Sequence, residues 1–135
     1  MNQRPRRNRL NPAIRGLIRE SQVNPANLVW PAFVQGGKNL RSPIASMPGI
    51  SRLSIDQLVT DCQRAFDLGV PAVALFPALE ESLKNSEGKE GLNPNGLLQR
   101  AVKELKKTIP GMLVITDVAL DPYSSDGHDG LVKDG

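Results

Sequence analysis

The sequence has 135 residues, of which 39% are hydrophobic, 4% aromatic and 23% charged. This length is about that of one domain, and the composition is typical of a globular chain rather than a disordered one. No apolar run approaches the roughly 20 residues of a membrane-spanning helix, and the arginines that follow Met1 precede no apolar segment. We therefore expect a cytoplasmic protein without a membrane anchor or a secretory signal.

The net charge of +3 is unevenly distributed. Residues 1–20 contain six arginines and a single acidic residue, Glu20, a balance of +5, which leaves −2 for residues 21–135. Clustered arginines can neutralise nucleic-acid phosphates, but no aromatic residue is interleaved to stack on bases. Ile14, Leu17 and Ile18 instead have the spacing of a short amphipathic helix. We predict an arm over residues 1–26 that docks on protein, with a nucleic-acid-binding module as the alternative.

Three apolar runs of strand length punctuate the body of the chain, residues 27–135. They occupy residues 28–34, 70–77 and 112–115. The first is followed by Gly36 and Gly37, and the stretch up to Gly49 is rich in proline, which predicts a loop or a short hairpin.

Two segments between these runs have apolar residues at helical spacing. The first is predicted to begin at Ser54, with Gln57 three residues later as a capping box, and to end at Gly69. Cys62, the only cysteine, lies on its apolar face and is predicted to be a core residue rather than a nucleophile. The second helix is predicted to follow Asn95 as its N-cap and to end before Pro110.

The spacing of the strands predicts an α/β fold. Their starts are about forty residues apart, which leaves room for a crossover helix between successive parallel strands. Three such units form either a small doubly wound sheet or the beginning of a (β/α)8 TIM barrel, which needs roughly 250 residues in full. Because the sequence stops in a loop after the third strand, we expect it to be cut rather than finished.

The loop after the third strand carries the candidate chemistry. Asp117, Asp121, Asp126, His128 and Asp129 follow a buried strand, and α/β proteins place their sites at the carboxyl ends of strands. Carboxylate oxygens suit hard cations such as Mg²⁺, although aspartates before proline or glycine are also common turn residues. A small carboxylate or metal-dependent enzyme is therefore a further alternative, without a glycine-rich phosphate loop to support it.

Several segments resemble the porphobilinogen synthase family, also called 5-aminolevulinate dehydratase. They are residues 4–9, 28–34, 46–49, 75–77, 95–97 and, most specifically, 117–130. The resemblance implies a metal-dependent (β/α)8 TIM-barrel enzyme, of which this chain would hold an N-terminal arm and the first three βα units. The enzyme is a lyase that joins two 5-aminolevulinate molecules with loss of two waters. Its product, porphobilinogen, serves tetrapyrrole (heme and chlorophyll) biosynthesis. The resemblance also implies an N-terminal arm that embraces a neighbouring subunit, usually in a homo-octamer.

Within this resemblance, individual positions can be matched. Asp117 matches an active-site aspartate at the end of its strand. Ala119, Asp121 and Asp129 stand where zinc-dependent members carry three cysteines, which resembles the branch that works with Mg²⁺ or K⁺ and disfavours Zn²⁺ at the active site. Asp126 departs from the histidine that many members have at that position.

The family's chemistry also needs two lysines that form Schiff bases with the two substrates, and such lysines must be desolvated to be neutral. All seven lysines of this chain fall in polar loops or on solvated helix faces. They are Lys38, Lys84, Lys89, Lys103, Lys106, Lys107 and Lys133. We therefore expect that this chain lacks both Schiff-base lysines and is inactive when isolated.

Overall fold

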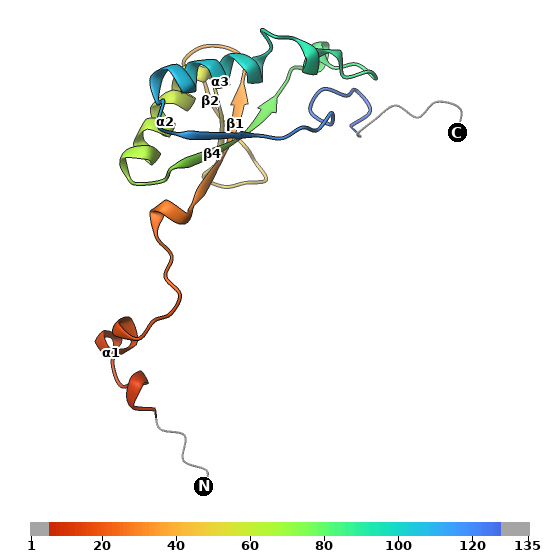
Figure 1. Ribbon diagram of the computed structural model, residues 1–135. Coiled ribbons are helices and arrows are strands. Elements are labelled where there is room, and N and C mark those ends of the chain that lie inside the picture. The colour runs from red at the N-terminus through yellow and green to blue at the C-terminus, as the bar shows by residue number, and fades with distance from the viewer. Residues whose placement is uncertain (1–5, 128–135) are drawn as a thin grey trace.

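The computed structural model describes residues 6–127. Its first part is an extended segment with a turn of 3-10 helix at Arg7–Arg9, a short helix α1 at Pro12–Leu17 and a second 3-10 turn at Pro25–Asn27. The Asn11 side chain caps α1 by accepting a hydrogen bond from the Ile14 amide at 2.9 Å. Figure 1 shows that this segment extends away from the body, and most of its side chains are exposed. The predicted short helix is confirmed.

A five-stranded mixed sheet forms the body, with the strand order β2-β3-β1-β4-β5. Three of the strands are parallel neighbours: β1 (Val29–Gln35), β4 (Ala72–Ala78) and β5 (Leu113–Thr116). They are connected by the helices α2 (Ile55–Asp67) and α3 (Leu97–Thr108). The three predicted parallel strands and both predicted crossover helices are confirmed.

The proline-rich stretch after β1 forms a hairpin. Its strands β2 (Arg41–Pro43) and β3 (Ser51–Leu53) are antiparallel, and β3 pairs in parallel with β1. That pairing involves only Phe33 and Val34, at the carboxyl end of β1. The hairpin therefore adds two short strands to the sheet, beside the carboxyl end of β1 and on the side opposite to β4.

Both helices cover the same face of the sheet, and they contact each other as well as β1 (Figure 1). Residues of β1 and β4 that point toward them are fully or almost fully buried, namely Ala32, Val34, Val73 and Leu75. Side chains alternate along a strand, so the remaining residues face the opposite, helix-free side. On that side the Phe33 and Phe76 rings lie 5.8 Å apart, while Leu113 and Ile115 of β5 are 59% and 40% exposed. The sheet therefore has one packed face and one bare apolar face.

The ends of the helices follow the expected chemistry only in part. At the end of α2, Gly69 has φ +90°, and the amides of Gly69 and Val70 donate to the carbonyls of Phe66 and Ala65, so the predicted end is confirmed. The capping box is wrong, since the Ser54 side chain makes no cap hydrogen bond. Its hydroxyl is instead engaged by the loop before β2.

The start of the second helix is also displaced from the prediction. The N-cap of α3 is Gly96 rather than Asn95, and it provides no side-chain cap. The Asn95 amide is bonded within the preceding turn, where it donates to the Asn93 side chain at 2.9 Å.

Cys62 lies in the core of the molecule, as predicted. It is completely buried on α2, and burial raises the pKa of its thiol to about 12. A thiol that is rarely ionised and shielded from solvent is a poor nucleophile and a poor metal ligand. Within residues 6–127, no helix has both the length and the apolar character needed to cross a bilayer.

Candidate active site at the carboxyl edge of the sheet

The carboxyl ends of β1, β4 and β5 meet at one edge of the sheet, because the three strands are parallel. A hollow of about 660 Å³ opens at this edge, bounded by residues that follow each of the three strands. Its lining comprises Phe33, Gln35, Gly36, Leu40, Arg52, Pro77, Ala78, Leu79, Glu80, Glu81, Lys84 and Pro122. Open α/β sheets bind their ligands at such an edge, so the location agrees with the one expected from the sequence.

Asp117 follows the last residue of β5 directly. It lies one residue beyond the register pair Leu75 and Thr116, at the carboxyl edge. Alternation along the strand assigns it to the same helix-free face as Leu113 and Ile115, and it is exposed. The predicted active-site aspartate therefore lies just past the end of β5 at the carboxyl edge, although it is not among the residues that line the hollow.

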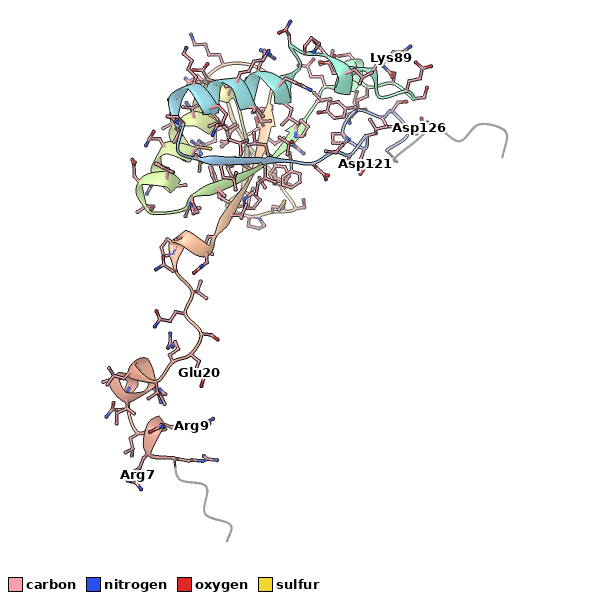
Figure 2. All side chains as sticks on the ribbon, in the orientation of Figure 1. Arg7, Arg9, Glu20, Lys89, Asp121 and Asp126 are labelled. Carbon is pink, nitrogen blue, oxygen red and sulfur yellow. The ribbon has the colours of Figure 1, made fainter. Side chains whose placement is uncertain are left out.

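The predicted metal-binding positions are only partly described. Asp121 and Asp126 are exposed on the loop after β5, and Ala119 is half-buried there (Figure 2). Asp129 and His128 lie outside the described residues. Across residues 6–127, no three His, Cys, Asp or Glu side chains gather closely enough to hold a metal ion. A site that uses Asp121 and Asp129 stays a prediction.

The loop after β5 is docked on the loop between β4 and α3. Two reciprocal backbone hydrogen bonds join them: the Asn85 amide donates to the Tyr123 carbonyl, and the Ser125 amide donates to the Asn85 carbonyl, each at 3.2 Å. The Asn85 side chain also accepts hydrogen bonds from the amides of Glu87 and Lys89 at 3.1 and 3.2 Å. Asn85 is therefore the point at which the two loops are joined.

Tyr123 packs its ring into the same junction and is only 7% exposed. Its ring lies against Gly91, where an added Cβ would be 3.4 Å from Cδ2 of the tyrosine. Burial, followed by the charge of Glu90, raises the pKa of Tyr123. No sequence pattern marks Asn85 or Gly91, whereas Tyr123 is the only tyrosine of the chain and lies within the aspartate-rich loop, which is a visible signal.

Four lysines within residues 6–127 have hydrogen-bond or ion-pair partners. Lys84 alone lines the hollow, and its ammonium forms an ion pair with Glu81 at 2.6 Å. Lys103 and Lys106 donate to backbone carbonyls near the ends of α3, and Lys89 pairs with Glu87. A Schiff-base lysine must be neutral to attack a carbonyl, and these four lysines are held by carboxylates or backbone carbonyls instead. That the chain lacks both Schiff-base lysines stays a prediction.

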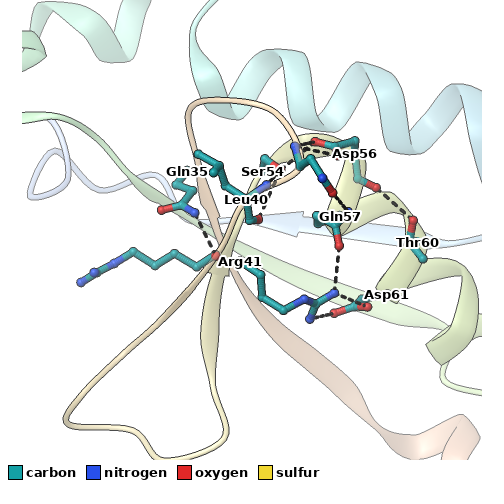
Figure 3. A network of polar contacts seen from close by, with 10 residues as sticks. Gln35, Leu40, Arg41, Ser54, Asp56, Gln57, Thr60 and Asp61 are labelled. Carbon is teal, nitrogen blue, oxygen red and sulfur yellow. Dashed lines mark hydrogen bonds and ion pairs between the residues drawn. The ribbon is translucent and has the colours of Figure 1, made fainter.

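A polar network holds the loop between β1 and β2, which forms one wall of the hollow (Figure 3). The Asn39 amide donates to both carboxylate oxygens of Asp56, at 2.9 and 3.1 Å, and Asn39 has φ +54°. The Ser54 hydroxyl donates to Asp56 at 2.7 Å and accepts from the Leu40 amide at 2.9 Å. Asp56 and Ser54 thus bind the loop instead of capping α2.

The pKa of Asp56 is lowered in this network, chiefly by the hydrogen bond from the Ser54 hydroxyl and also by the Asn39 amide. Beside it, Arg41 forms a two-point contact with Asp61 at 2.7 and 2.9 Å, which raises the pKa of Arg41. The network therefore connects the β1–β2 loop and the start of β2 to the first turns of α2 through hydrogen bonds to the Asp56 and Asp61 carboxylates.

Residues 2–135 match the family model described as delta-aminolevulinic acid dehydratase. The delta-aminolevulinic acid dehydratase of Bradyrhizobium diazoefficiens is 49% identical over 132 residues, which cover 98% of this chain and 37% of that protein. The chloroplastic enzyme of Physcomitrium patens is 47% identical over 132 residues, covering 97% of this chain and 30% of the relative. The chain thus spans about a third of the length of these curated relatives.

A solved structure is similar to this chain over nearly the whole length of the chain. It is the crystal structure of delta-aminolevulinic acid dehydratase (porphobilinogen synthase) from Toxoplasma gondii in complex with the reaction product porphobilinogen. The TM-score is 0.92 at 46% identity, and the match covers 99% of this chain and 38% of that chain.

The Asp56 network generates a prediction about pH. In the unfolded chain an aspartate has a pKa of about 3.9. When folding lowers the pKa of such a carboxyl group, the group stabilises the fold at pH values above the unfolded pKa. This contribution is lost as the pH falls through the lowered folded pKa. We expect Asp56→Asn to lower Tm at pH 7, and the difference from wild type to shrink progressively below about pH 4.

Thermal unfolding followed by circular dichroism between pH 2 and 7 measures this effect. Asp67→Asn is the matched control, because that carboxylate on α2 only accepts a hydrogen bond from the exposed Gln63 amide. Equal Tm values for wild type and Asp56→Asn at pH 7 would contradict the stabilising role of the network.

Proposed function

The chain belongs to the delta-aminolevulinic acid dehydratase family, and we propose that it is the N-terminal portion of a porphobilinogen synthase. The reaction condenses two 5-aminolevulinate molecules to porphobilinogen with loss of two waters, as a step of tetrapyrrole biosynthesis. The observation that carries the proposal is the close match of nearly the whole chain to a structure with porphobilinogen bound. The cytoplasm is the proposed location.

The proposed architecture is the first part of a (β/α)8 barrel. In that arrangement β1, β4 and β5 are the first three barrel strands, α2 and α3 lie outside, and the helix-free face is turned toward the interior. The exposed Leu113 and Ile115 support this proposal, because apolar side chains on a sheet normally pack against another layer. Residues 27–135 would then be part of one barrel domain that this chain leaves incomplete.

Asp117 is proposed to act at the carboxyl edge, where barrel enzymes carry out their chemistry. Its carboxylate is exposed at the end of β5, at the same edge as the hollow although outside its lining, and would exchange a proton with a substrate that extends from the hollow toward β5. The Schiff-base lysines would come from other parts of a longer protein. The isolated chain is therefore proposed to be inactive.

The residues of the loop after β5 fit a hard cation better than zinc. The loop offers the carboxylate of Asp121 and, outside the described residues, that of Asp129, with Ala119 at the third family position. The only cysteine is buried in the core on α2, so it cannot supply a thiolate to this loop. We propose Mg²⁺, or K⁺, as the bound cation, which would supply positive charge beside the reacting groups.

Residues 1–26 are proposed to be an intersubunit arm of a homo-octamer. Leu10, Leu17 and Val23 are 73%, 87% and 86% exposed. Apolar side chains gathered on one short segment favour a surface that is covered by a partner. The arm carries +5 within residues 1–20, whereas the rest of the chain carries −2, which suits docking on another copy. Nucleic-acid binding has no such second support.

The first prediction concerns activity. A longer protein that contains this chain should form porphobilinogen from 5-aminolevulinate, and Asp117→Asn should lower kcat by about 100-fold or more, the usual scale for losing a proton-transfer group. Asp67→Asn should have wild-type activity. Residues 1–135 alone should give neither product nor a substrate adduct after borohydride reduction. Product formation by the isolated chain would show that its own lysines suffice.

The second prediction concerns the metal. After chelation, added Mg²⁺ should restore the activity of the longer protein, and Asp121→Ala should raise the Mg²⁺ concentration needed for half-maximal activity. Oxygen ligands favour Mg²⁺, whereas zinc sites of this kind rely on thiolates. Restoration by Zn²⁺ alone would contradict the proposed cation.

The third prediction concerns assembly. Deleting residues 1–26 from the longer protein should reduce the oligomer mass measured by light scattering, because the arm's exposed apolar residues would no longer bridge subunits. An octamer of unchanged mass would rule out the arm as an assembly element.

A further inference from the structure

We propose that Tyr123, seated against Gly91 and joined through Asn85, is a positioning residue that holds the loop after β5 in register with the β4–α3 loop. The inference rests on the proposed function, because the loop it positions carries Asp121. Tyr123, Gly91 and Asn85 take no part in the proposed metal and Schiff-base chemistry.

The two loops have no strand pairing of their own in this region, so other contacts must align them. The Asn85 amide and carbonyl bond to Tyr123 and Ser125, two residues that alternate along the opposite loop, as partners do in a short β-bridge. On the loop after β5, the two residues bonded to Asn85 lie between Asp121 and Asp126 in the sequence. A displacement of Asn85 would therefore be transmitted to both sides of the aspartate-bearing segment.

Both partners of the bridge are stiffened within their own loops. The Asn85 side chain accepts two amide hydrogen bonds, from Glu87 and Lys89, which close a turn around it. On the opposite side, the buried Ser124 hydroxyl accepts from the Asp126 amide at 3.1 Å. The bridge therefore joins two preformed turns.

The aromatic ring makes this junction specific. Gly91 has no side chain, and the ring of Tyr123 occupies the space, with three ring atoms 3.4 to 3.6 Å from the position of an added Cβ. Gly88, at φ +60°, turns the same loop beneath Leu120, whose Cδ2 lies 3.3 Å from the corresponding point. A smaller side chain at position 123 would leave a void between the loops. At position 91 an added Cβ alone would make ordinary van der Waals contact with the ring, whereas a side chain with atoms beyond Cβ would crowd it.

The test uses the longer protein that contains this chain, with hydrogen exchange by mass spectrometry as the main readout. Tyr123→Ala should speed amide exchange about tenfold or more in both loops, residues 85–91 and 120–127, while exchange in α3 and β4 is unchanged. Tyr123→Phe keeps the ring and should restore slow exchange. Leu92→Ala is the matched control, since this apolar side chain of the same loop is 87% exposed.

Activity supplies a second readout. Tyr123→Ala should lower kcat about tenfold and should raise the Mg²⁺ requirement, with Tyr123→Phe close to wild type. If Tyr123→Ala does not fold, Gly91→Val provides the same test, because it crowds the ring and leaves the tyrosine in place.

Faster exchange in only one loop, equal loosening of α3 and β4, or failure of phenylalanine to restore slow exchange would each overturn the proposal. A wild-type protein that forms no porphobilinogen would refute the proposed function, while the exchange measurements would still decide this inference.

Discussion

The structure depends on the burial of one face of a parallel sheet beneath two crossover helices. Parallel neighbours cannot be joined by a tight turn, so β1, β4 and β5 are connected through α2 and α3. Connections of the usual right-handed sense place both helices on the same face when the strands are added in one direction, as in the order β1-β4-β5. Val34, Leu75 and Leu105 are completely buried between the layers. The opposite face is left apolar and uncovered.

This arrangement also decides where chemistry can occur. Parallel strands end at one edge, so three loops that are far apart in the sequence meet around a single hollow. Backbone groups in such loops need hydrogen-bond partners, and here side chains and neighbouring loops provide them. Asp56 and Ser54 hold the β1–β2 loop, while Asn85 and Tyr123 join the other two. The β1–β2 loop at this edge is therefore hydrogen-bonded to the start of α2, and the other two loops are hydrogen-bonded to each other.

Much of this fold could be predicted from the sequence, because the signals were periodic and local. The apolar runs at residues 28–34, 70–77 and 112–115 correspond to β1, β4 and β5, and Gly69 ends α2 because only a residue tolerant of positive φ fits there. For the hairpin, residues 41–53, the sequence predicts a loop or a short hairpin without deciding between them. Its three-residue strands are too short to show alternation.

The errors have a common physical origin. Ser54 has the sequence signature of a helix cap, but its hydroxyl is used by Leu40 and Asp56, a competition that no local pattern reveals. Asp117 is a candidate because it follows a strand and matches a position of the family, and its role stays a prediction. The docking of Tyr123 on Asn85 joins residues 38 positions apart. Contacts between distant loops depend on the completed fold. Asp129, half of the expected metal pair, lies outside the described residues.

The central claim is that the bare face of this sheet is the interior of a barrel whose carboxyl edge forms the active site. A crystal structure of the longer protein with porphobilinogen bound is its most direct test. The account predicts Leu113 and Ile115 inside a closed ring of strands, with the product over the hollow beside Asp117. An open sheet with helices on both faces, or product bound at the opposite edge of the strands, would contradict it.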